Sequence, residues 1–159
     1  MFDLDMNRLS DEQKRMVEVW EAHLAAEFAD KNASKSCDTM VDDPYVNHVP
    51  VLTGGSGRSQ LEYFYACYFI PQMPDDIELI PISRTVGYNR IVDEFVFRCT
   101  HSVQMDWLLP GIPPTGKKLE LVKVVIINFH NGKMVSEHIH WDQASALAQL
   151  GLIDTENLP

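Results

Sequence analysis

Apolar residues near the start of the chain recur every three to four positions, as they do on one face of an α-helix. The residues of this face are Met16, Val17, Trp20, Leu24 and Phe28. Ser10 precedes them, and Gln13 follows it at the spacing of a capping box. The pattern predicts a long amphipathic helix from Ser10 to about Ala29.

The next stretch predicts a short helix over Ser36–Val41, which Pro44 would end, and then a strand over Tyr45–Leu52. Glycines fill residues 54, 55 and 57, but the Lys-Ser/Thr pair of a phosphate-binding loop is absent. We therefore interpret 54–57 as a loop that opens a second amphipathic helix. This helix carries Leu61, Phe64, Tyr65 and Tyr68.

After Pro71–Pro74 the pattern changes to strands. The expected elements are strands Ile77–Val86 and Ile91–His101 around the turn Gly87–Asn89, a loop Leu109–Gly116, strands Leu119–Phe129 and Met134–Trp141 around the hairpin signal Asn131-Gly132, and a closing helix Gln143–Leu150.

Helices come first and strands last, which is typical of an α+β fold with helices on one side of a mostly antiparallel sheet. A long twisted sheet that wraps around the N-terminal helices makes a cone, and its open end is a natural pocket. The length fits one domain, residues 1–159. We expect a cone-shaped barrel that holds a small organic molecule.

Side chains alternate along a strand, so its two faces can be separated. On Ile91–His101 the mainly apolar face ends at His101 and is expected to point inward. On the last strand His138, His140 and Asp142 share one face, and Glu137 and Trp141 share the other. We predict that the histidine face lies inside, although a one-residue bulge near Ser136 would reverse the faces.

Other candidate site residues come from aromatic and imidazole side chains. Trp20, Tyr65 and Trp107, together with His138, are predicted to bind substrate. His48 lies in the middle of its strand and is a further candidate for acid/base chemistry. Each of these histidines also has a purely structural interpretation, as a hydrogen-bonded residue of a sheet.

The composition argues against several classes of function. The formal net charge of −10 disfavours nucleic-acid binding. No apolar run is long enough to span a membrane. The cysteines Cys37, Cys67 and Cys99 are odd in number and widely spaced, which indicates reduced thiols. The acidic start Met1–Asp5 is unlike a signal peptide, so a cytoplasmic protein is expected.

Several C-terminal motifs resemble those of SnoaL-like polyketide cyclases, which belong to the nuclear-transport-factor-2-like (NTF2-like) superfamily with ketosteroid isomerase and scytalone dehydratase. The motifs are Pro114-Thr115-Gly116, Gly132-Lys133-Met134-Val135, Glu137-His138, Asp142 and Gln149-Leu150-Gly151. The order of predicted elements agrees with this fold over nearly the whole chain.

The resemblance implies a general acid/base at Asp142 and no metal or organic cofactor. The family's partner histidine would fall near Asn128, so His101 or His140 would have to replace it. The resemblance thus favours a cyclase, isomerase or dehydratase that acts on a carbonyl-bearing, cyclic substrate. Asp142→Asn is expected to abolish activity on this view.

Two alternatives stay open. The chain could be a non-catalytic ligand-binding or accessory module, with the doubly apolar strand Leu119–Phe129 burying one face in a homodimer. It could instead hold a metal through His138 and His140, with His101 or Asp142 as third ligand.

Overall fold

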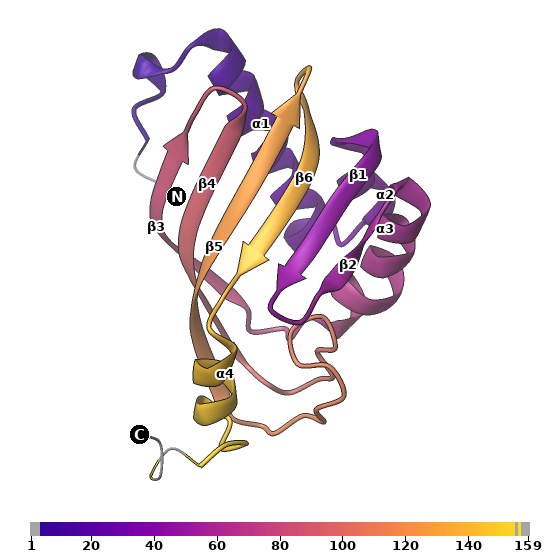
Figure 1. Cartoon of the computed structure of the whole chain (residues 1–159), viewed down its shortest axis with the longest axis vertical. Coiled ribbons are helices and arrows are strands. Elements are labelled where there is room, and N and C mark those ends of the chain that lie inside the picture. Colours follow the sequence, from indigo (N-terminus) through magenta and orange to yellow (C-terminus); the bar gives the residue numbers. More distant parts are fainter. Residues whose placement is uncertain (1–3, 155, 157–159) are drawn as a thin grey trace.

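A curved six-stranded sheet forms one wall of the molecule in the computed structural model (Figure 1). The strands are β1 (Met40–Val49), β2 (Thr53–Ser56), β3 (Glu78–Val86), β4 (Arg90–Thr100), β5 (Lys118–His130) and β6 (Lys133–His140). Their order is β2-β1-β6-β5-β4-β3, with a parallel pair at β1–β6 and antiparallel pairs elsewhere. The structure describes residues 4–154 and 156, so Met1–Asp3 of the acidic start lie outside the described residues.

The helices are η1 (Met6–Arg8), α1 (Asp11–Leu24) with its π-helical continuation η2 (Ala25–Ala29), α2 (Ala33–Asp38), α3 (Arg58–Phe64) with its π-helical continuation η3 (Tyr65–Phe69), η4 (Ile70–Gln72) and α4 (Gln143–Gln149). Of these, α1, α2 and α3 lie on the concave side of the sheet, whereas α4 packs against β5 at the lower end of Figure 1. The capping box of α1 is confirmed, because the Ser10 hydroxyl accepts from the Gln13 N–H at 3.2 Å and Gln13 Oε1 accepts from the Ser10 N–H at 2.9 Å. Within the described ranges, no helix is long and apolar enough to cross a membrane.

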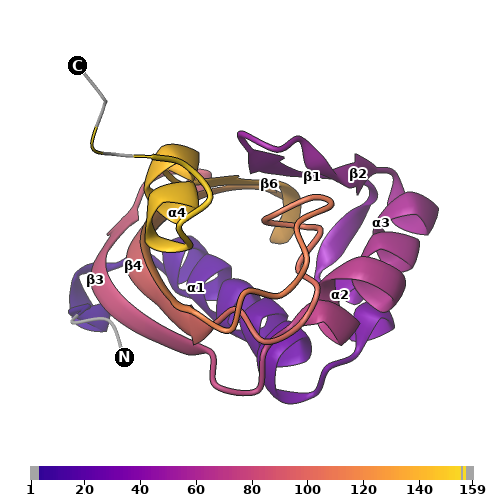
Figure 2. The same cartoon turned by 90° about the horizontal axis from the view of Figure 1, so that it is seen from below.

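Viewed from below, the sheet wraps around α1, and the segment between β4 and β5 lies across this end of the cone (Figure 2). Met105, Trp107, Leu108 and Leu109 of that segment are buried with the core. Its ends are tied by backbone bonds between His101 and residues 116 and 117. The segment therefore closes one end of the cone, and the α+β cone predicted from the sequence is confirmed.

Two N-terminal predictions were displaced. The short helix lies at Ala33–Asp38, because the side chain of Asn32 caps it by accepting from the Lys35 N–H at 3.0 Å. The predicted glycine loop forms strand β2, which pairs with β1. Gly54 permits this pairing, since a Cβ there would clash with the carbonyl oxygen of Val46.

A β-bulge in β6 decides which side chains point inward. Phe129 pairs with Met134 and Asn128 with Ser136, so Val135 is the extra residue. Beyond it Glu137 and Ile139 are buried, whereas His138 and His140 are only half-buried. The predicted inward histidine face was therefore wrong, and the reversed arrangement is the one observed.

Candidate active site

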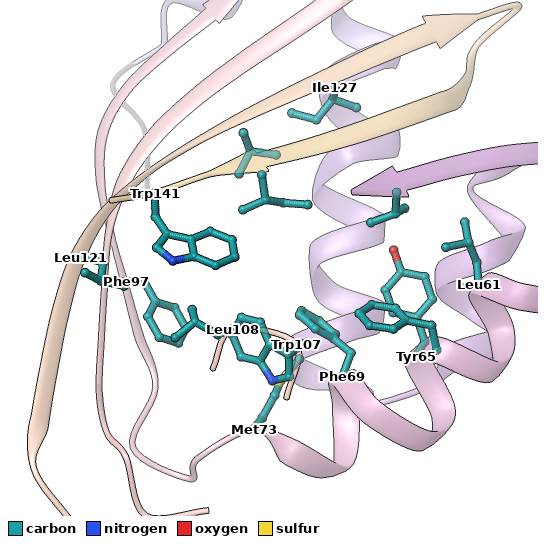
Figure 3. Packing of buried hydrophobic residues seen from close by; sticks show 14 of the residues in the cluster. Leu61, Tyr65, Phe69, Met73, Phe97, Trp107, Leu108, Leu121, Ile127 and Trp141 are labelled. Atoms are coloured by element: carbon teal, nitrogen blue, oxygen red, sulfur yellow. The ribbon is translucent and has the colours of Figure 1, made fainter. Parts of the chain in front are cut away.

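An aromatic cavity lies between α1, η3 and the inner face of the sheet. Its aromatic lining comes from Trp20, Phe28, Tyr65, Phe69, Phe95, Phe97 and Trp107. Figure 3 shows several of these rings with Trp141, which also faces this interior. The cavity is narrow, with a volume of about 40 Å³ accessible to water. Four polar side chains interrupt the apolar lining, and they are Glu27, His48, Lys123 and Glu137.

The structure brings four of the predicted residues together. His48, Trp20, Tyr65 and Trp107 all line this cavity. The indole Nε1 of Trp20 donates to Asp93 at 2.7 Å, and that of Trp107 donates to the Gln72 carbonyl at 3.3 Å. Both indoles are thus held by hydrogen bonds, which fixes the orientation of the rings that face the cavity.

Asp142 does not line the cavity. It is the N-cap of α4, where its carboxylate accepts from Ala144 N–H at 2.9 Å and from the Ser145 hydroxyl at 2.6 Å. Hydrogen bonds from Ser145, and then from the Ala144 N–H, lower the pKa of this exposed carboxyl. A solvent-exposed cap with a lowered pKa is a poor general base.

The other three predicted histidines also lie outside the cavity lining. His101 is buried beside Thr115, with 3.2 Å between Nδ1 and Oγ1, and its Nε2 has no hydrogen-bond partner in the described part of the chain. His138 packs its ring against Tyr45 on the outer side of β6. His140 follows on the same side and is half-buried.

A buried ion cluster joins α1 to the sheet at the cavity wall. The Nε2 atom of His23 lies 3.1 Å from Oε1 of Glu27 and 3.7 Å from Oε2 of Glu137. The Tyr65 hydroxyl lies 3.3 Å from the same nitrogen. On the far side of the ring, Nδ1 contacts the Ser36 carbonyl, which only accepts, so Nδ1 carries a proton.

This cluster changes the protonation of its members. Burial opposes the charged form of His23, but the carboxylates of Glu27 and Glu137 outweigh it and raise its pKa to about 10. Burial raises the pKa of Glu137, against the hydrogen bond from His23. A carboxyl group whose pKa is moved toward neutrality is suited to exchange protons with a substrate.

Lys123 of β5 is the cationic residue of the cavity. Its side-chain nitrogen lies 4.1 Å from the ring centroid of Phe97 and 4.6 Å from that of Trp107. Burial lowers the pKa of Lys123 to about 7, although the charges of Cys99 and Glu137 act in the opposite direction. The amine is therefore partly neutral near neutral pH.

His48 lies among four aromatic rings on the wall formed by β1. Its Nδ1 lies 3.3 Å from the Thr53 carbonyl, which fixes the proton on this nitrogen. Burial, and then the charge of Lys123, lower the pKa of His48 to about 3. His48 is thus a neutral imidazole whose Nε2 has a lone pair.

His23, Glu27 and Lys123 were not among the predicted site residues, and Glu137 was placed on the outer face, although the sequence carries a signal for each. His23 and Glu27 fall on the apolar stripe of the first helix, at helical spacing from Met16 and Trp20. Lys123 interrupts an alternating apolar face of β5, and Glu137 alternates with Ile139. A charged residue at an inward position of an apolar pattern is the signal.

His23, Glu27 and Glu137 also form a group of potential metal ligands, with donor atoms within 4.8 Å of one another. Imidazole and carboxylate donors suit zinc and other divalent transition metals. Across the described residues, the predicted pair His138 and His140 belongs to no such group of three.

A curved sheet wrapped around an N-terminal helix, with an aromatic cavity between them, is the arrangement of the NTF2-like fold, and known structures agree. A putative SnoaL-like polyketide cyclase from Jannaschia sp. CCS1 superposes with a TM-score of 0.71 at 15% identity, over 92% of this chain and 98% of that one. A Catenulispora acidiphila protein with a ketosteroid isomerase-like fold, in complex with trimethylamine, gives 0.63 at 15% identity, over 89% and 98%. AclR, a putative hydroxylase from Streptomyces galilaeus, gives 0.63 at 17% identity, over 89% and 88%.

The sequence pattern of the SnoaL-like polyketide cyclases matches residues 13–150. The chain therefore belongs to this family, as the C-terminal motifs had indicated. Among curated proteins no significant match is found.

Proposed function

We propose that the protein is an enzyme that moves protons on a small, ring-shaped carbonyl compound, with Glu137 as the acid/base. The observation that carries this proposal is the carboxyl group of Glu137, buried at the wall of an aromatic cavity with a raised pKa. In this role Glu137 takes a proton from the carbon next to the carbonyl and returns it elsewhere. Asp142 has no part in the proposal, because it caps α4 in solvent.

The neighbouring residues have supporting roles in the proposal. His23 holds the carboxylate of Glu137 from one side, and Tyr65 bonds to the same imidazole nitrogen. Trp20 and Trp107 provide flat surfaces for a ring. His48 offers a neutral imidazole as a hydrogen-bond partner for the substrate, and the amine of Lys123 contacts the substrate carbonyl.

Hydrogen–deuterium exchange tests the proposal without knowledge of the natural substrate. Cyclic ketones and 1,3-diketones are incubated with the protein in D₂O, and loss of the proton next to the carbonyl is followed by NMR. Glu137→Gln should slow exchange by about 10²- to 10⁴-fold, the usual contribution of a general base. Asp142→Asn decides between the two carboxylates, since Asn still caps a helix; loss of exchange in that variant alone would return the role to Asp142.

A metal-dependent reaction is the second candidate, favoured by the donor group His23, Glu27 and Glu137. Elemental analysis of untagged protein tests it. About one transition-metal ion per chain, together with loss of proton exchange when a chelator is added, would favour the metal-dependent reaction over proton transfer by Glu137.

A ligand-binding module without chemistry would bind the same compounds but give no exchange.

For either role we propose a homodimer formed through the outer face of β5, where Val122 is 52% exposed. Light scattering measures the molar mass of the wild-type protein and of Val122→Glu; we expect a dimer for the first and a monomer for the second.

We also propose a cytoplasmic location, with which the free thiols Cys37, Cys67 and Cys99 agree.

A further inference from the structure

Lys123 occupies a position where the strand pattern calls for an apolar side chain. On β5 it alternates with Leu121 and Val125, both buried, and it pairs with Phe95 of β4. The residue is 3% exposed. Among the described residues no hydrogen bond or ion pair to its amine is found, so no polar partner accounts for an ammonium at this position.

The surroundings of the amine consist mainly of ring faces. Its nitrogen lies 4.1, 4.6 and 5.1 Å from the ring centroids of Phe97, Trp107 and Trp141. Ring faces attract an ammonium but accept no full hydrogen bond, so they do not replace the water that burial removes. A methionine would fill the same space at no electrostatic cost. A lysine that is buried at the wall of a cavity in spite of this desolvation cost is a candidate for a reactive residue.

We propose that Lys123 is a nucleophile that forms an imine with a small, ring-bearing aldehyde or ketone bound in the cavity. The inference rests on the proposed function and deepens it, because it names a covalent intermediate and the substrate class. A buried amine that is partly neutral at neutral pH has the lone pair that the attack requires.

The step balances with groups that line the cavity. The lone pair of Lys123 forms a bond to the carbonyl carbon, and the carbonyl oxygen becomes a hydroxyl with a proton transferred from the amine. The carboxylate of Glu137 first takes a proton from the ammonium form of Lys123 and then gives it to this hydroxyl, which leaves as water while nitrogen forms the iminium. No oxidant or reductant is needed. Hydrolysis of the iminium reverses the sequence and frees the amine.

The iminium makes the proposed proton transfer easier. Its positive nitrogen withdraws electrons from the adjacent carbon more strongly than a neutral carbonyl oxygen does. The carboxylate of Glu137, re-formed by the proton transfer to the hydroxyl, then removes the proton from that carbon and gives an enamine. The narrow aromatic cavity restricts this chemistry to small, flat carbonyl compounds unless side chains move.

Reductive trapping tests the inference on the full chain. Benzaldehyde is the probe, and sodium cyanoborohydride reduces an iminium to a stable amine. We expect one benzyl group on Lys123 in the peptide map at substoichiometric probe, ahead of exposed lysines such as Lys118 of the same strand. Its labelling rate should be half-maximal near pH 7, where the amine titrates. Labelling of Lys118 and other exposed lysines with Lys123 unmodified would overturn the inference.

Two variants separate this inference from the proposed function. Lys123→Met should lose the adduct and slow the exchange of ketone protons at least tenfold, whereas Lys118→Met should change neither. Glu137→Gln should lose exchange yet keep a slower adduct on Lys123. Exchange that depends on Glu137 but persists in Lys123→Met would overturn the imine and leave the proposed function standing. An adduct on Lys123 with full exchange in Glu137→Gln would contradict the proposed base instead.

Discussion

The imidazole of His23 on α1 lies 3.7 Å from the carboxylate of Glu137 on β6, so one buried ion pair joins the first helix to the last strand. Both side chains are buried, and Glu27 extends the pair by a second carboxylate. The contact therefore forms part of the cavity wall and also connects two elements that are far apart in the sequence.

Removal of the imidazole should destabilise the fold strongly. His23→Gln leaves two buried carboxylates without their cation, and loss of one partner of a buried ion pair costs about 3–5 kcal/mol. The free energy of unfolding in urea measures the effect. His130→Gln, at the exposed end of β5, is the control and should change it by less than about 0.5 kcal/mol.

The contribution of His23 should also depend on pH. Its pKa is raised from 6.5 to about 10, so its stabilisation is complete below pH 6.5 and is lost as the pH rises through 10. The difference in stability between wild type and His23→Gln should shrink over this window, by up to about 1.4 kcal/mol per pH unit. A difference that stays constant with pH would show that His23 is neutral in the folded protein.

Lys123 should give a pH dependence of opposite sign. Its pKa is lowered from 10.5 to about 7, so the folded state is penalised below pH 7 and the penalty disappears as the pH rises toward 10.5. Glu137 and Cys99 raise this pKa, and His48 is the further titratable group near the amine. Lys123→Met should therefore be more stable than wild type at pH 6, with an advantage that decreases at higher pH. Lys118→Met on the exposed face should show no such trend.

A second buried network should be as sensitive as the first. Asp93 receives two bonds from Arg84, at 2.7 and 2.6 Å, and one from the Trp20 indole at 2.7 Å. Asp93→Asn removes the charge that Arg84 pairs with, and we expect a loss of about 3–5 kcal/mol in urea unfolding. Glu94→Gln, next in sequence and less buried, should cost less than about 0.5 kcal/mol. Equal effects in both variants would contradict this assignment.

Thiol reactivity should separate the three cysteines. Cys67 is exposed, while Cys37 and Cys99 are buried. Burial raises the pKa of Cys37 to about 11 and that of Cys99 to about 12. Iodoacetamide should modify Cys67 in the native protein and the other two only after unfolding, as peptide mapping can measure. Rapid modification of Cys99 without unfolding would show that the inner face of β4 opens to solvent.

The sequence predicted the fold better than the site. Capping of α1 by Ser10 and the hairpin at Asn131-Gly132 are local, and both were found from neighbouring residues. The face of β6 depends on an unpaired Val135, and pairing with a distant strand decides this. Glu137 was consequently placed outside and His138 inside, the reverse of the burial that the structure shows.

The bulge at Val135 also has a consequence for how this site can change over generations. The eight residues of β6 carry two sets of side chains, one with Glu137 and Ile139, the other with His138 and His140. Deletion of Val135 would remove the bulge without turning the strand, because Ser136 already pairs with Asn128. If the bulge closed with all eight residues kept, Val135 would pair with Asn128 and the second set would turn toward the interior. Two interior chemistries, one acidic and one rich in imidazole, are therefore a one-residue register shift apart, with no amino-acid substitution between them.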